Sequence, residues 1–156
     1  MHAAALGTLL FSAALAAGPG ATKPAGDPAK LVVTVNPPAA APGQQVEVVV
    51  GVEPNPGIKV NRYPKMKLQV PAAAGLVGEA EASVGASEMP PLEHAEKNYY
   101  TTVDPVSVKV SVDPKAPKGA HKVQAKFTYY YCVAASGYCA PGTKDVVFTV
   151  PVAAGP

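Results

Sequence analysis

The amino-acid sequence predicts an all-β protein, an immunoglobulin-like sandwich of two antiparallel sheets. Short valine-rich runs alternate with clusters of Pro, Gly, Asn and Asp, and the 18 prolines stand mainly at the ends of these runs. From residue 31 onward, no stretch keeps the 3.6-residue apolar period of a helix over about ten residues. The expected strands are residues 31–35, 45–52, 65–70, 80–84, 99–103, 106–112, 121–131 and 145–150.

The chain is expected to begin with a secretory signal peptide at residues 1–17, because this run is rich in Ala and Leu and carries an Ala-Leu-Ala cleavage site at 14–16. A buried helix is the alternative interpretation. Residues 18–30 are rich in Pro, Gly and Ala and are expected to form a flexible leader. Residues 31–156 then form one domain of ordinary size. The sequence therefore predicts an exported protein.

Composition argues against two classes of partner. The 13 Lys and Arg residues are scattered among 11 Asp and Glu residues, for a net charge of +2, so no basic stripe is offered to a nucleic acid. The apolar run at the start is shorter than the roughly 20 residues that span a bilayer. We expect a monomer that binds no nucleic acid, does not insert into a membrane and carries no metal or other cofactor.

Two predicted strands show which side chains face the core. In "VDPVSVKVSVDP" the valines at 106, 108, 110 and 112 share one face, and Ser and Lys occupy the other. The same period in residues 121–131 directs Val123, Phe127 and the tyrosines at 129 and 131 inward. Extended by one residue, it directs Cys132 outward, and the cysteine pair is expected to be accessible.

Both cysteines lie in "YYYCVAASGYCAPG", with six residues between Cys132 and Cys139. An antibody-type disulfide instead joins inward-facing residues far apart in sequence, beside a buried Trp, and this chain has no Trp. Closing so small a ring stabilises a fold by only about 2.5 kcal/mol on the chain-entropy model. The spacing alone leaves two interpretations open: a local structural disulfide, or a pair that exchanges with a partner's thiols.

The segment "AKFTYYYCVAASGYCAPGTKDVVFTVPV" resembles the end of the N-terminal periplasmic domain of the thiol:disulfide interchange protein DsbD family. Upstream, "GIKVNRYPKMKLQVPAAAGLVGE" and "VSVKVSVDPKAPKGAHKVQAKFTYYYC" are similar to earlier segments of that domain. The resemblance implies an immunoglobulin-like, periplasmic thiol–disulfide oxidoreductase with a reversible Cys132–Cys139 disulfide. It assigns Cys139 the attack on the partner and Cys132 the resolving step.

The resemblance also implies a cap loop over the cysteines, here about residues 88–100, "EMPPLEHAEKNYY", with Tyr99 or Tyr100 in place of the family's aromatic shield. The expected partners are periplasmic thioredoxin-like oxidoreductases and a membrane electron donor. Both would be encoded separately, because the sequence shows no membrane segment or Cys-x-x-Cys module after this domain. The loop between the cysteines is one residue longer than is common in the family. A non-catalytic protein-binding module with a structural disulfide is the alternative function.

Other side chains suggest further roles. Lys126 and Lys144 are candidates for tuning the thiolate, because an ammonium group nearby lowers a thiol pKa, although ordinary surface lysines are the alternative. Tyrosines in "TYYYC" and "NYY" suggest stacking on a sugar or base, against a core or interface role. A soft copper site has less support, because its imagined ligands match no spacing motif. Those ligands would be Met66, Met89, His94 and His121.

Overall fold

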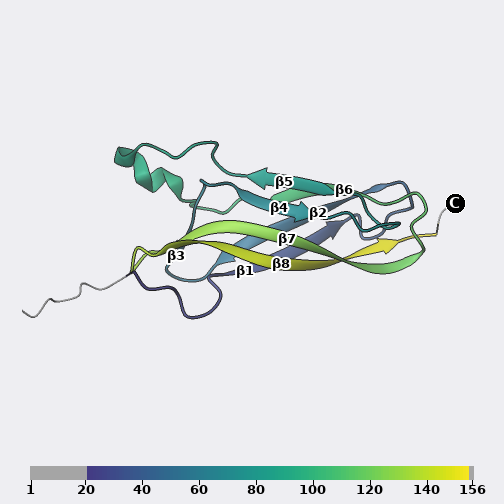
Figure 1. Ribbon diagram of the computed structural model, residues 1–156, viewed down its shortest axis with the longest axis horizontal. Coiled ribbons are helices and arrows are strands. Elements are labelled where there is room, and N and C mark those ends of the chain that lie inside the picture. Colours follow the sequence, from purple (N-terminus) through teal and green to yellow (C-terminus); the bar gives the residue numbers. More distant parts are fainter. Residues whose placement is uncertain (1–20, 155–156) are drawn as a thin grey trace, which may run out of the picture.

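The computed structural model describes residues 21–154, so the expected signal peptide lies outside the described residues. The chain forms two antiparallel sheets (Figure 1), which confirms the predicted all-β sandwich. One sheet has the order β1-β2-β6, and the other contains β3, β4, β5, β7 and β8. A 3-10 helix, η1 (Leu92–Asn98), lies between β5 and β6. The strands are β1 (Ala29–Asn36), β2 (Gln45–Pro54), β3 (Ile58–Val60), β4 (Met66–Val70), β5 (Ala80–Val84), β6 (Val106–Ser111), β7 (Gly119–Val133) and β8 (Cys139–Val152).

The three-stranded sheet contributes a valine layer to the core. Val46, Val48 and Val50 of β2 are fully buried, and the residues between them are only partly covered. On β6 the predicted inward valines are buried and the Ser and Lys residues are exposed. β-Branched side chains have few rotamers to lose and pack well on a pleated surface. This alternation is what fixes the register of β2 against β6.

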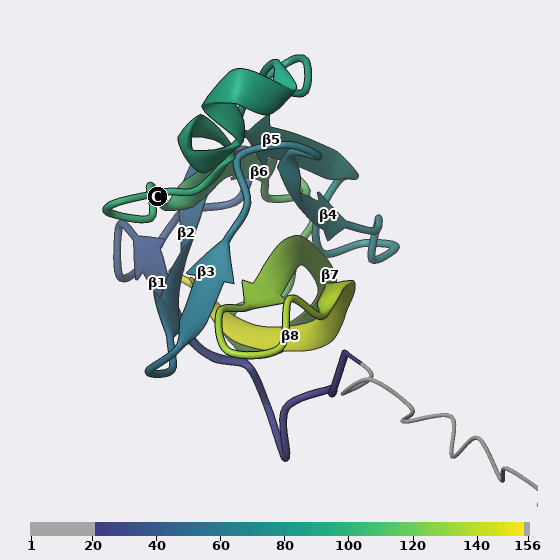
Figure 2. The same ribbon diagram turned by 90° about the vertical axis from the view of Figure 1, so that its left-hand side faces the viewer.

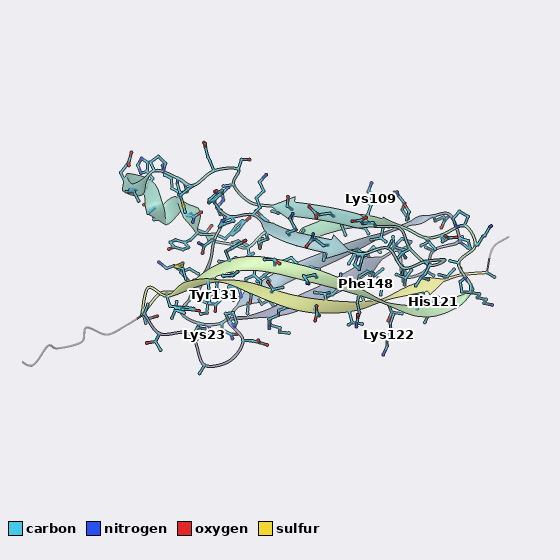
Figure 3. The ribbon with its side chains drawn as sticks, viewed as in Figure 1. Lys23, Lys109, His121, Lys122, Tyr131 and Phe148 are labelled. Carbon is cyan, nitrogen blue, oxygen red and sulfur yellow. A yellow bond between two sulfur atoms is a disulfide. The ribbon has the colours of Figure 1, made fainter. Side chains whose placement is uncertain are left out.

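The second sheet is organised by β7, the longest strand. β8 pairs with β7 along one edge, from Gly119↔Val152 to Cys132↔Cys139. The other edge pairs first with β4, near Phe127, and then with β3, near Tyr131. Phe127, Tyr129 and Tyr131 are buried as predicted. Figure 3 shows Tyr131 near one end of the sandwich and Phe148 further along β8, with Lys109 and Lys122 pointing away from the core.

Three expectations about the strands need correction. Residues 99–103 do not form a strand, because only Tyr99 makes an isolated bridge, to Asn61, before the chain bends. β3 was not predicted, since its three residues are too short for a visible alternation. β8 begins at Cys139 rather than at residue 145. Pro141 is tolerated in β8 because, among the described strands, β8 pairs with β7 alone, and the bridge on its other edge, Ala40↔Val152, lies at the far end of the strand.

The N-terminal leader is held against the fold over its described part. β1 begins at Ala29, two residues before the expected start of the domain, and Ala29 is buried. The Asn55 side chain donates to Asp27 O at 2.7 Å, and Ser136 Oγ donates to Thr22 O at 2.9 Å. Asp27 also forms an ion pair with Lys144. These contacts tie the segment to the same end of the sandwich as the cysteine pair, the end that faces the viewer in Figure 2.

Among residues 21–154, no helix has the length and apolar character needed to cross a bilayer.

Candidate functional site: the disulfide at the tip of the β7–β8 hairpin

Cys132 and Cys139 form a disulfide at the tip of the β7–β8 hairpin. They are opposite each other in the strand register, with Cα atoms 4.1 Å apart and sulfurs 2.02 Å apart. The next pair outward carries the backbone hydrogen bond from Val133 N to Tyr138 O, at 2.7 Å. Cys132 and Cys139 therefore occupy a non-hydrogen-bonded pair, the position at which antiparallel strands approach most closely. Backbone hydrogen bonds on the outer side of the disulfide close the hairpin independently of it.

The loop beyond the disulfide is a tight turn. Gly137 adopts a φ of 68°, in the left-handed region that glycine enters without steric cost, and its N–H donates to Val133 O at 2.9 Å. Ala134 N donates to Gly57 O at 2.8 Å, which attaches the turn to the loop before β3. The tip is thus fixed by several backbone bonds.

The two sulfur-bearing residues differ sharply in exposure. Cys132 is 4% exposed, whereas Cys139 is exposed. The predicted outward direction of Cys132 agrees with the burial of Tyr131 on the inner face, but the expected accessibility of Cys132 was wrong. Other segments cover the outer face of β7 at this point, and strand parity carries no information about them. A reagent in solvent therefore meets Cys139 first.

Two side chains from outside the hairpin lie against the Cys132 sulfur. Tyr99, directly after η1, donates its hydroxyl to Cys132 Sγ at 3.6 Å. Asn61, just after β3, places Oδ1 3.6 Å from the same sulfur. Both residues sit where the chain pairs Asn61 with Tyr99 in an isolated bridge. The predicted cap segment therefore lies beside the disulfide and contacts its buried half.

Asn98 attaches the cap to the rest of the fold. Asn98 is 6% exposed, and within residues 21–154 it is the one polar residue that is buried. Its Oδ1 accepts from Tyr63 N at 2.9 Å and its Nδ2 donates to Tyr63 O at 3.1 Å. Its own carbonyl accepts from Arg62 N at 2.6 Å. The side chain thus imitates a backbone pairing, and it holds η1 to the segment that follows β3.

The other predicted site residues lie elsewhere. Tyr100 is part-buried, packs against the core and carries Arg62 5.7 Å from its ring centroid. Lys126 lies six residues before Cys132 on β7, and Lys144 lies five residues after Cys139 on β8. At about 3.3 Å per strand residue, these separations are on the order of 16 to 20 Å. That exceeds the screening length of about 8 Å, so the structure brings neither lysine to the disulfide.

Lys59 is a lysine beside the pair, and it is not among the residues predicted from the sequence. It lies directly opposite Cys132 in the β3–β7 register, and its Nζ sits 5.0 Å from the centroid of the Tyr99 ring. No local signal identifies Lys59, because β3 is too short to be recognised and its pairing with β7 is non-local.

A shallow, mostly apolar hollow of about 230 Å³ opens beside Cys139. Met89, from the segment before η1, is 56% exposed and forms part of its wall, and Leu92 at the start of η1 is 92% exposed. Met89 thus exposes an apolar side chain beside Cys139, whereas Leu92 does not line the hollow. The hollow is lined by Asn61, Tyr63, Pro64, Met89, Tyr130, Tyr131, Cys139, Ala140 and Pro141.

Tyrosines fill the core behind the disulfide. The rings of Tyr129 and Tyr131 are tilted against each other with centroids 6.0 Å apart, and Tyr138 continues the row, with its centroid 6.4 Å from that of Tyr131. Burial, with a smaller contribution from the charge of Asp27, raises the pKa of Tyr129 to about 12. Burial also raises the pKa of Tyr131. The ring of Tyr129 lies over Gly142, where an added Cβ would stand 2.6 Å from Tyr129 Cζ. These rings pack within the fold and are not displayed for stacking on a ligand.

The residues considered for copper are dispersed. Met66 is in the core, His94 pairs with Glu96, and His121 Nε2 lies 2.7 Å from Pro117 O. Within residues 21–154, no group of three or more His, Cys, Asp or Glu side chains is arranged to hold a metal ion.

Comparison of the chain with protein-family models and with curated proteins finds no match.

Proposed function

We propose that this protein is a periplasmic thiol–disulfide exchange domain that passes electrons between partner oxidoreductases through the Cys132–Cys139 pair. One observation carries the proposal: the pair combines one exposed cysteine with one that is buried and in contact with a cap. An exchange protein needs one sulfur that a partner can reach and a second that waits to resolve the mixed disulfide. A structural disulfide gains nothing from this asymmetry.

The proposed exchange begins at Cys139, the exposed residue of the pair. A partner thiolate attacks Cys139 Sγ, the Sγ–Sγ bond breaks, and its electron pair goes to Cys132 Sγ. A second partner thiol then displaces Cys139, so the partner leaves as a disulfide and this domain keeps two thiols. In the reverse direction the Cys139 thiolate attacks a partner disulfide, and Cys132 resolves the mixed disulfide.

The hairpin supports this chemistry because it does not depend on the disulfide. Backbone bonds close the tip beyond the cysteines, and β7 pairs with β8 over its full length below them. Reduction therefore leaves the two thiols facing each other. The apolar hollow at Cys139, with Met89 on its wall, provides a place for the partner's own active-site surface.

The deciding measurement is the reduction potential of the pair, obtained by equilibrating the protein in graded thiol/disulfide buffers and counting free thiols by alkylation. We expect a value on the order of −120 to −270 mV, as for exchange proteins. A potential below about −300 mV would mark a structural disulfide and favour the non-catalytic binding module.

A trapping experiment tests the roles of the two cysteines. In an exported Cys132→Ser variant, Cys139 should accumulate a mixed disulfide with a thioredoxin-like oxidoreductase, because the resolving thiol is gone. Cys139→Ser is the matched control and should trap much less, since Cys132 is covered. Equal trapping by both variants, or by neither, would contradict the assignment.

A further inference from the structure

The cap places the Tyr99 hydroxyl against one of the two disulfide sulfurs, that of Cys132. Tyr99 Oη lies 3.6 Å from Cys132 Sγ, the buried atom, and not against Cys139 where attack occurs. When a thiolate attacks Cys139, negative charge develops on Cys132 Sγ as the leaving group. The donor is therefore aimed at the atom that gains charge, an arrangement that stabilises a transition state more than the resting disulfide.

The buried position of Cys132 makes such a donor necessary. Burial disfavours a thiolate and raises the thiol pKa, and a thiol of higher pKa leaves more slowly in exchange. A hydrogen bond to the thiolate and an ammonium group nearby have the opposite effect. Lys59 supplies the ammonium group, opposite Cys132 in the register and with Nζ over the Tyr99 ring.

Asn61 completes the surroundings of the sulfur. Its Oδ1 lies 3.6 Å from Cys132 Sγ and is an acceptor, so it suits the protonated thiol. Tyr99 suits the thiolate. The leaving sulfur thus has one partner for each protonation state, and both partners come from the Asn61–Tyr99 bridge that holds the cap in place.

We propose that Tyr99 is a catalytic hydrogen-bond donor to the leaving Cys132 thiolate, supported by the charge of Lys59, rather than only a cover for the disulfide. This inference rests on the proposed exchange function. It concerns a step that a small dithiol reproduces: a dithiothreitol thiolate attacks Cys139, Cys132 leaves and takes a proton from water, and the second dithiol sulfur releases Cys139. The reagent becomes a cyclic disulfide, and the protein gains two electrons.

The test compares Tyr99→Phe with Tyr100→Phe in the oxidised full chain. Each change removes one hydroxyl and keeps the ring, but the Tyr100 hydroxyl is buried without a hydrogen-bond partner, and its ring contacts Arg62. We expect reduction by dithiothreitol to slow about tenfold in Tyr99→Phe, the factor for one net hydrogen bond of about 1.4 kcal/mol. Tyr100→Phe should keep the original rate.

A second readout isolates the thiolate. In a Cys139→Ser background, the ultraviolet absorbance of the thiolate gives the pKa of Cys132. Tyr99→Phe should raise this pKa by about 1, and Lys59→Gln should raise it by less, with Lys109→Gln on the other sheet as the control. Unchanged rate and pKa in Tyr99→Phe would overturn the proposal, and so would faster reduction, which would mean that Tyr99 acts as a cover alone.

Circular dichroism establishes that each variant is folded. If Tyr99→Phe does not fold, the Lys59→Gln comparison decides, and a Cys132 pKa equal to that of Lys109→Gln would reject the proposal. Both readouts use a small dithiol or no reductant. A low reduction potential or a failure to trap a protein partner would therefore reject the proposed function without deciding the role of Tyr99.

Discussion

The middle of the sandwich and its disulfide end are built in different ways. In the middle, buried valines alternate with more exposed residues along β2 and β6, and they share one apolar core with Leu68 and Phe127. At the disulfide end, tyrosines replace valines, and the hydroxyls of Tyr100 and Tyr129 are buried without hydrogen-bond partners. The middle is packed with apolar side chains, whereas the end contains costly buried hydroxyls around the disulfide. Such costs are common at functional sites.

The largest effect is expected from Asn98→Ala, which removes the link between the cap and the segment after β3. Tyr63 N–H and C=O then lose their buried partners, at a cost of about 2 kcal/mol or more. The cap should open locally while the middle stays folded. In a Cys139→Ser background, alkylation of Cys132 should accelerate about 30-fold, which corresponds to about 2 kcal/mol.

Gln124→Ala is the control for this experiment, because Gln124 is exposed on the outer face of β7, away from the cap. It should leave the alkylation rate unchanged. If Asn98→Ala instead lowered the urea midpoint for the whole domain without a selective increase at Cys132, the end and the middle would be one cooperative unit, and the comparison would fail.

The same division explains what the sequence could predict. Strand β6 and most of β2 and β7 were found because an alternation of valines with polar residues is a local signal with only one buried face. The same two-residue period predicted that Tyr129 and Tyr131 point toward the core and that Cys132 points to the opposite face of β7. The cysteine pair was also identified from its spacing.

The rest of the site depends on non-local contacts. Three features depend on β3 and the residues that follow it, which lie between β7 and the cap: the burial of Cys132, the position of Lys59 and the hydrogen bonds of Asn98. These pairings join residues separated by tens of positions, and no period in the sequence encodes them. The expectation of a strand at 99–103 was wrong for the same reason: its aromatic residues serve the cap and the core, not a ladder.

An intermediate effect is expected from adding a methyl group at two strand glycines. At the disulfide end, Gly142→Ala would place Cβ 2.6 Å from Tyr129 Cζ, so the buried ring must shift, at a cost of about 1–3 kcal/mol. In the three-stranded sheet, Gly51→Ala meets nothing closer than 3.8 Å and should change the free energy of unfolding by less than about 1 kcal/mol. Urea unfolding measures both. Equal costs would show that the end is no more tightly packed than the strands of the other sheet.

The smallest effect at neutral pH is expected from Tyr129→Phe, which removes a buried hydroxyl that has no hydrogen-bond partner. Stability should change by less than about 1 kcal/mol, in either direction. The stabilities of Tyr129→Phe and the unaltered protein should differ at alkaline pH, because burial raises the pKa of Tyr129 in the folded protein from 10.0 to about 12. Between these values the unfolded chain has lost a proton that the folded one keeps, so the free energy of unfolding falls as pH rises.

Below pH 10 the contribution of Tyr129 to the free energy of unfolding is fully present, and it is lost progressively as the pH rises toward 12. Urea midpoints measured across this range should therefore fall less steeply in Tyr129→Phe than in the unaltered protein. Part of the slope should remain, because burial also raises the pKa values of Tyr100 and Tyr131. An identical slope in the two proteins would mean that the Tyr129 hydroxyl reaches solvent. The disulfide end would then be open where the structure shows it closed.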